Sequence, residues 1–284
     1  MSNRFSRSWQ LVKSSWSVLQ QDRQLLVFPL MSAIAAIVVV LSFALPLFGF
    51  AALDGLARTR QYATPVYSYA SAFLLYVSLY FVIFFFNAAL VSAAMVRFDG
   101  GQPTIRGSLR VAGSKMGSIL GYSILAATVG VVLRFVQERV GFVGKIMVSL
   151  LGAGWTVATY LVVPILVVRD TGPIQAVLES ATILKKTWGE NVVGQTGMAA
   201  TFGLIHFSVV LLGILAISAA AAHGAGLGIA VAAFMAVAGL IFVSLLQAAL
   251  GGIYAAALYR YAAGLPLPEA FNASAMQMAF APKI

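Results

Sequence analysis

The chain has 284 residues, of which 61% are hydrophobic and only 9% are charged, and its formal net charge is +10. Globular domains carry about 25% charged residues, so this composition excludes an ordinary soluble protein. The absence of cysteine excludes disulfides, thiolate metal ligands and thiol nucleophiles. The composition therefore indicates an integral membrane protein.

The N-terminal segment, residues 1–23, is polar and amphipathic. The apolar run that follows it is much longer than the hydrophobic region of a signal peptide, so we expect this start to be retained. The predicted apolar face of a first, interfacial helix is formed by Phe5, Trp9, Val12, Trp16 and Leu19.

Five windows without Asp, Glu, Lys or Arg follow, at residues 24–53, 61–96, 116–133, 146–168 and 191–259. A helix needs about 20 apolar residues to cross the hydrocarbon core, so each of the first four windows holds one span. The last window is long enough for two spans, with a turn near His223. Residues 73–86 do not alternate as barrel strands do. The predicted fold class is an all-α integral membrane protein with six transmembrane helices.

Three junctions after the even-numbered spans share an arginine, a glycine and a proline, at residues 97–103, 169–173 and 260–266. The arginine opposes the negative end of the helix, the glycine lets the chain leave it, and the proline suits the start of the next helix. The first two junctions match each other more closely than either matches the third. They predict three tandem units, 1–97, 98–169 and 170–264, and a tail, 265–284, within one polytopic membrane domain, 1–284.

Each unit is predicted to begin with an amphipathic helix. After the first two junctions the apolar faces of these helices are predicted to be Ile105, Leu109, Ala112 and Met116, and Ile174, Leu178, Ala181 and Leu184. One interpretation is that these helices are connectors packed against the bundle. Another is that they form a lipid-facing collar or a surface for partners, and both can hold.

The basic residues predict the orientation. If Met1 is cytoplasmic, thirteen of the 18 Lys and Arg residues lie on its side of the membrane and five on the other. We therefore expect a multi-pass protein of the bacterial inner membrane with both termini cytoplasmic, in contact with anionic lipid headgroups and not with nucleic acid. The predicted interface anchors are Arg97, Arg169, Arg260, Trp9 and Trp16.

Polar side chains at membrane depth are candidate functional residues. They are Asn87, His206, Gln247, Thr159 and Tyr80. No acidic or basic residue lies near the middle of a predicted span, which disfavours a proton or metal-ion transporter. Contacts between helices, worth about 0.5–2 kcal/mol each, explain Asn87 and Gln247 most simply, and a hydrogen bond to a neighbouring helix explains His206.

A catalytic interpretation has little support. The segment Gly121-Tyr-Ser123 resembles the glycine-x-serine signature of rhomboid proteases, but the second glycine of that motif is missing. Ser123 lies near the cytoplasmic surface, whereas His206 lies deeper and on another span, so a nucleophile–base pair is not expected. We predict no enzymatic activity, no cofactor and no metal.

Small residues and one proline suggest packing features. Ala248, Gly252 and Ala256 recur every four residues, as in faces that pack within a chain or between subunits. Pro164 can interrupt its span, and an interrupted helix can line a site.

The N-terminal pattern Phe5-Ser-Arg-Ser-Trp9-Gln-Leu-Val-Lys13-Ser-Ser-Trp16, followed by Asp22 to Pro29, resembles an uncharacterised six-span bacterial membrane family, a domain of unknown function. That family is distantly similar to the membrane domain attached to some glycerophosphodiester phosphodiesterases. The resemblance implies a membrane fold and carries over no catalytic residue, since the phosphodiesterase domain is not in this sequence.

Two functions remain open. The first is a non-enzymatic protein that forms a homo-oligomer or organises lipids and partners through its cytoplasmic interfacial helices. The second is a channel or facilitator for a small or lipid-like solute, lined by the five polar residues named above.

Overall fold

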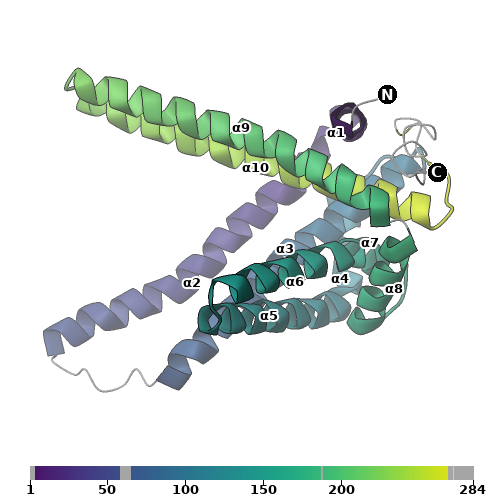
Figure 1. Ribbon diagram of the computed structural model, residues 1–284, viewed down its shortest axis with the longest axis horizontal. Coiled ribbons are helices and arrows are strands. Elements are labelled where there is room, and N and C mark those ends of the chain that lie inside the picture. Colours follow the sequence, from purple (N-terminus) through teal and green to yellow (C-terminus); the bar gives the residue numbers. More distant parts are fainter. Residues whose placement is uncertain (1–3, 58–64, 187, 268–270, 272–284) are drawn as a thin grey trace. The chain divides into compact units, whose positions relative to one another are not determined.

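A computed structural model describes residues 4–57, 65–186, 188–267 and 271. In these ranges the secondary structure is helical, without strands (Figure 1). Six helical segments are long and apolar enough to cross a membrane, in agreement with the six predicted spans. They are Arg23–Leu45, Ala70–Phe98, Met116–Arg139, Phe142–Val168, Ala200–Ala222 and Gly226–Ala262.

The long helices are α2 (Val27–Ala57), α3 (Pro65–Phe98), α5 (Met116–Arg139), α6 (Phe142–Ala158), α9 (Trp188–Ala222) and α10 (Gly226–Ala262). The shorter ones are α1 (Arg4–Gln21), the 3-10 helix η1 (Arg23–Leu26), α4 (Ile105–Ser114), α7 (Val162–Val168) and α8 (Pro173–Lys186). Pro65 and Pro173 are the first residues of α3 and α8, where a missing N–H costs no helical hydrogen bond.

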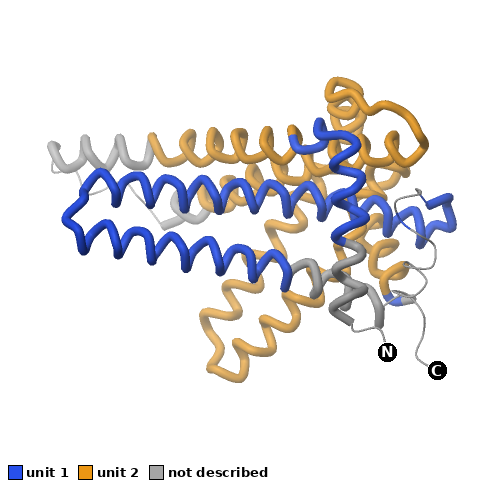
Figure 2. The backbone as a smooth tube through the Cα atoms, turned by 90° about the horizontal axis from the view of Figure 1, so that it is seen from above, with its two compact units in different colours: residues 1–26, 185–284 blue, residues 27–184 orange. Residues whose placement is uncertain are grey.

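Contacts between Cα atoms divide the chain into two compact units (Figure 2). Unit 1 comprises Met1–Leu26 and Lys185–Ile284, and unit 2 comprises Val27–Leu184. The predicted tandem units follow chain order, whereas unit 1 joins the N-terminal helix to the last two long helices.

Helix α3 is central in unit 2 and contacts α2, α4, α5 and α7. Its buried stretch is rich in alanine, including Ala88, Ala89, Ala93 and Ala94. Such small side chains let neighbouring helices approach closely. Helix α7 contributes larger buried side chains, among them Ile165 and Leu166.

Helix α4 packs on α3 along only part of its predicted face. Thr104 caps its N-terminus, where Oγ1 accepts a 3.1 Å hydrogen bond from the Gly107 N–H. The buried residues of α4 are Ser108 and Ala112. Of the predicted face, therefore, only Ala112 is buried, and Met116 belongs to α5 with 47% of its surface exposed.

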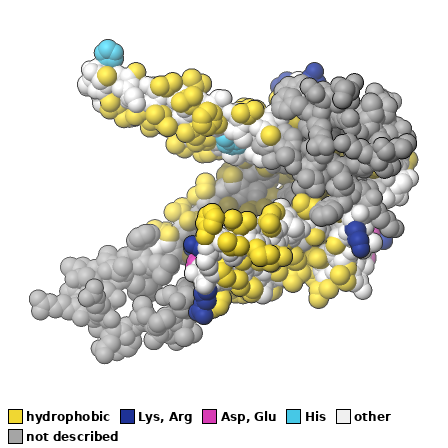
Figure 3. Space-filling model, viewed as in Figure 1, with side chains coloured by type: hydrophobic (Ala, Val, Ile, Leu, Met, Phe, Trp, Pro, Cys, Tyr) yellow, Lys and Arg dark blue, Asp and Glu magenta, His cyan; other side chains and the backbone are white. Residues whose placement is uncertain are grey.

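In unit 1, α9 and α10 run side by side as a hairpin, and α1 contacts both helices. A Cβ placed on Gly213 would lie 2.7 Å from the Cβ of Ala236, and one on Gly239 would lie 3.3 Å from Val209 Cγ1. These distances show that the two backbones approach closely at glycines. Hydrophobic side chains cover the outside of this hairpin (Figure 3).

The predicted small-residue face of α10 is mainly used inside the chain. Gly252 and Ala256 are buried, whereas Ala248 is exposed. Packing within the chain therefore accounts for Gly252 and Ala256 without a second subunit.

The three junctions pair differently from the prediction. Gly100 and Gly264 have φ of 78° and 68°, and each is followed by a residue whose N–H bonds five residues back, to Val96 O and Arg260 O respectively. These are Schellman caps, which favour glycine because of its left-handed conformation. Gly172 is not among the positive-φ glycines of the described residues. The first and third junctions thus match each other, and the second ends its helix without such a cap.

Candidate functional site

The fourth span is broken inside unit 2. Helix α6 ends at Ala158 and α7 begins at Val162, so Thr159, Tyr160 and Leu161 lie outside regular helix. Pro164 explains the break, because it has no N–H and its ring conflicts with the carbonyl of the residue four positions earlier. The expectation that Pro164 interrupts its span agrees with this geometry.

A serine from α8 satisfies the backbone at this break. The Leu161 N–H donates a 3.1 Å hydrogen bond to Ser180 Oγ, and both residues are fully buried. An unpaired buried N–H costs about 1–3 kcal/mol, so this bond stabilises the broken span. Ser180 was not predicted as a functional residue, because a serine on an amphipathic helix is typical of its polar face.

Two of the predicted polar residues lie on either side of Tyr122 in α5. Thr159 Oγ1 donates to Trp155 O at 2.8 Å, and its side chain is hydrogen-bonded to that of Tyr122. The Tyr122 ring stacks on Phe84 at 4.5 Å between centroids, and Phe84 stacks on Tyr80 at 5.5 Å. The structure therefore connects Tyr80 to Thr159 through a column of three aromatic rings.

His206 links the two helices of the hairpin in unit 1. Its Nδ1 lies 2.8 Å from Phe202 O and its Nε2 lies 3.0 Å from Ser244 Oγ on α10. Because a carbonyl only accepts, Nδ1 is the donor to Phe202 O, and the Ser244 hydroxyl itself donates a 2.8 Å hydrogen bond to Leu240 O one turn earlier. This is the contact with a neighbouring helix that offered the simplest explanation of His206.

The other two predicted polar residues have no such contact with the described residues. Asn87 on α3 and Gln247 on α10 are half-buried. No side-chain hydrogen bond of either residue is found within the described part of the chain. Asn87 belongs to unit 2 and Gln247 to unit 1.

Ser123, the residue of the rhomboid-like segment, is fully buried. Its hydroxyl donates a 2.8 Å hydrogen bond to the Ile119 carbonyl one turn earlier. This local bond satisfies the serine without a catalytic base.

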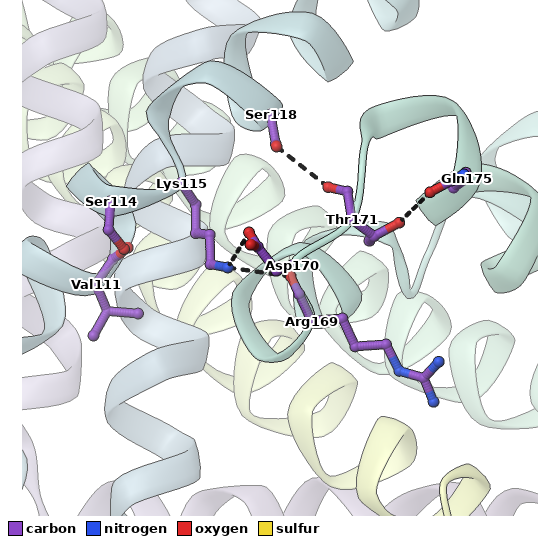
Figure 4. Close-up of polar contacts among 8 residues, drawn as sticks. All are labelled: Val111, Ser114, Lys115, Ser118, Arg169, Asp170, Thr171 and Gln175. Atoms are coloured by element: carbon purple, nitrogen blue, oxygen red, sulfur yellow. Dashed lines mark hydrogen bonds and ion pairs between the residues drawn. The ribbon is translucent and has the colours of Figure 1, made fainter.

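The second junction is held by Lys115, which lies between α4 and α5, and by Ser118 of α5 (Figure 4). Lys115 Nζ donates to Asp170 Oδ1 at 3.1 Å and to Arg169 O at 3.3 Å. Ser118 Oγ donates to Thr171 O at 3.2 Å. Contacts with other elements therefore replace the glycine cap found at the first and third junctions.

The predicted arginine anchors lie in different environments. Arg97 is half-buried, and Arg169 is exposed with its Nη1 3.0 Å from Glu179 Oε1. Arg260 is only 6% exposed, and its Nε donates to Pro266 O at 2.9 Å. Arg260 thus bonds to the chain just beyond the end of α10.

The two tryptophan anchors are on α1. Trp16 is 39% exposed, as an interfacial side chain would be. The side chain of Trp9 lies outside the described part of the structure.

Comparison with known proteins finds one family. Residues 66–265 match DUF6159, a family of unknown function. No curated protein and no solved structure matches the chain. The match extends from α3 to just beyond α10, so the N-terminal pattern from Phe5 to Pro29 lies outside it. Because the match covers most of the chain, this membrane protein belongs to DUF6159.

Proposed function

We propose that the protein is a non-enzymatic, multi-pass protein of the bacterial inner membrane that forms a homo-oligomer or organises anionic lipids and partners through its cytoplasmic interfacial helices. Its termini are cytoplasmic, and its single polytopic domain consists of three units, each with an interfacial helix and two spans. A distant likeness to the membrane domain of some glycerophosphodiester phosphodiesterases remains part of this proposal.

The order and packing of the helices support the three-unit arrangement. The short helices α1, α4 and α8 each precede two of the candidate spans. Helix α4 contacts α3, which precedes it in the chain, and α1, which no span precedes, contacts α9 and α10. Short helices packed on the ends of long ones suit the membrane interface.

The observation that carries the proposal is the fixed basic face of α4. Ser108 and Ala112 are buried, and Arg106 and Arg110 are exposed on the side of the helix away from them. Thr104 caps α4 and the helix packs on α3, so the two exposed arginines have a positioned backbone, and each basic residue attracts anionic headgroups by about 1 kcal/mol.

The test is native mass spectrometry of the detergent-extracted protein, with its bound lipids identified. We expect oligomers that retain anionic phospholipid, and we expect Arg106→Gln with Arg110→Gln to lose most of that lipid. The control pair is Arg139→Gln with Lys145→Gln, which removes two charges where α5 ends and α6 begins, at the end of α5 far from α4. This control should retain the bound lipid. A lipid-free monomer without a partner, or equal lipid loss in both pairs, would overturn the proposal.

The second candidate function is a channel or facilitator for a small or lipid-like solute. Its supporting observation is the broken fourth span, where Thr159 and the aromatic column from Tyr122 to Tyr80 meet irregular backbone. The test is flux into proteoliposomes for ions, neutral solutes and lipid. Absence of flux, with Thr159→Val, Asn87→Ala and Gln247→Leu behaving as the parent protein, would exclude this function.

A further inference from the structure

Helix α8 has three distinct faces. Ala176, Ser180 and Leu184 recur every four residues and are buried. About a third of a turn away, Ile174 is 66% exposed and Leu178 is 63% exposed. The predicted apolar face therefore divides, since Leu184 is buried and Ile174 and Leu178 at its other end are exposed.

A polar face completes α8. Gln175 and Thr182 are exposed next to the Ile174–Leu178 stripe, on the side opposite the buried row. Lys185 is also exposed and lies in line with the stripe, two turns after Leu178. A helix with one apolar stripe, one polar face and a lysine at the end of the stripe is typical of the membrane interface.

Two contacts locate α8 relative to the spans. A Cβ placed on Gly121 of α5 would lie 2.9 Å from Pro173 Cγ, so the start of α8 lies directly on that glycine. Further along α8, Ser180 accepts the hydrogen bond from Leu161.

These contacts give a depth for the helix. Gly121 is five residues from the end of its span at Met116, and Leu161 is seven residues from the end of its span at Val168. At about 1.5 Å per residue, the contacts lie about 8 Å and about 10 Å inside the span ends. Interfacial helices lie about 5–10 Å into the boundary between headgroups and acyl chains, so these distances match that depth when the span ends lie at the headgroups.

We propose that α8 is inserted into the cytoplasmic leaflet, with Ile174 and Leu178 among phospholipid acyl chains and Lys185 bound to the phosphate of an anionic phospholipid. This inference rests on the proposed membrane function and names its lipid contact. The occupant is lipid because the stripe lies at acyl-chain depth, and the lysine in line with it complements an anionic headgroup. Helix α4 has no exposed large apolar side chain among its described residues, so its contribution to lipid binding is the charge of its arginines.

The absence of cysteine in the sequence permits a direct test. Single variants Ile174→Cys, Leu178→Cys, Gln175→Cys and Thr182→Cys are spin-labelled in the full chain and placed in nanodiscs of phosphatidylethanolamine and phosphatidylglycerol. Labels at 174 and 178 should be accessible to oxygen and shielded from a water-soluble nickel chelate, at a depth of about 5–10 Å below the phosphates. The matched labels at 175 and 182 should show the reverse.

Two outcomes would overturn the inference. Equal nickel accessibility at all four positions would place α8 in water. Shielding of 174 and 178 from both reagents would place a protein partner on the stripe. The proposed function has a separate readout, which is the loss of bound anionic lipid in the mass spectra of the Arg106 and Arg110 variants. The inference about α8 can therefore fail while the proposed function stands.

A second measurement tests the headgroup. Quenching of a fluorophore at Leu178→Cys by doxyl-labelled phosphatidylglycerol is compared with quenching by doxyl-labelled phosphatidylcholine. Lys185→Gln should lower the preference for the anionic lipid by about fivefold, and Lys145→Gln should leave it unchanged. An unchanged preference in the Lys185 variant would remove the phosphate contact from the proposal.

Discussion

The hairpin of α9 and α10 and the region of α5, α6 and α7 are both built from apolar spans, yet different forces hold them together. In the hairpin, glycines bring two continuous helices close, as at Gly213 and Ala236. In the other region, one span is broken and Ser180 and Tyr122 supply its hydrogen bonds. Apolar surface alone does not associate spans in lipid, so close packing and polar bonds provide two solutions.

The largest expected effect is at the close contact of the hairpin. Gly213→Ala places a Cβ 2.7 Å from that of Ala236, and we expect a loss of about 3 kcal/mol, because neither backbone can move far. The measurement is the free energy of unfolding in detergent. Gly203→Ala on the same helix meets nothing within 4 Å and should be neutral or slightly stabilising. Equal losses in both variants would contradict close packing as the cause.

The next effect is at the broken span. Ser180→Ala leaves the buried Leu161 N–H without its partner and should cost about 2 kcal/mol of unfolding free energy. Faster hydrogen exchange at Leu161 is a second, local readout. Thr182→Ala on the exposed side of α8 removes only a bond to the Leu178 carbonyl and should change little. Slow exchange at Leu161 in the serine variant would show that the bond is dispensable.

A smaller effect is expected at the second junction. Glu179→Gln removes the ion pair with Arg169, whose side chain is 56% exposed, so the cost should be about 0.5 kcal/mol and should shrink in high salt. Glu138→Gln, which breaks the exposed pair with Arg134 on α5, is the matched control. A cost above about 2 kcal/mol would mean that this pair, rather than Ser180, positions α8.

The smallest effect is expected in α1, in the same unit as the hairpin. Ser15 is fully buried, and its hydroxyl is the one buried side-chain group without a hydrogen bond among those described. Ser15→Ala should therefore leave the unfolding free energy unchanged or raise it by up to about 1 kcal/mol. A clear loss of stability would reveal a partner for this hydroxyl.

Much of the candidate site was not predictable from the sequence. Thr159, Tyr80 and His206 were recognised because polar groups inside long apolar windows are costly without partners. The sequence did not reveal their partners, Tyr122 and Ser244, or the serine of α8, Ser180. Each of these residues lies far along the chain from the group that it contacts. The backbone conformation of the junctions was not predictable either. Gly100, Gly172 and Gly264 have similar neighbours in the sequence, yet only Gly100 and Gly264 adopt a positive φ.

The six spans follow from the order of amino acids alone, because the lengths of uncharged apolar windows are set by the thickness of the bilayer. Local periodicity also predicted short helices in the regions where the structure has α4 and α8. Which side of each helix is covered depends on tertiary contacts. The apolar residue buried on α4 is Ala112, while Ile174 and Leu178 of α8 are left exposed. The physical reason is that burial depends on contacts between residues far apart in the chain, and helical periodicity specifies a face without specifying what packs on it.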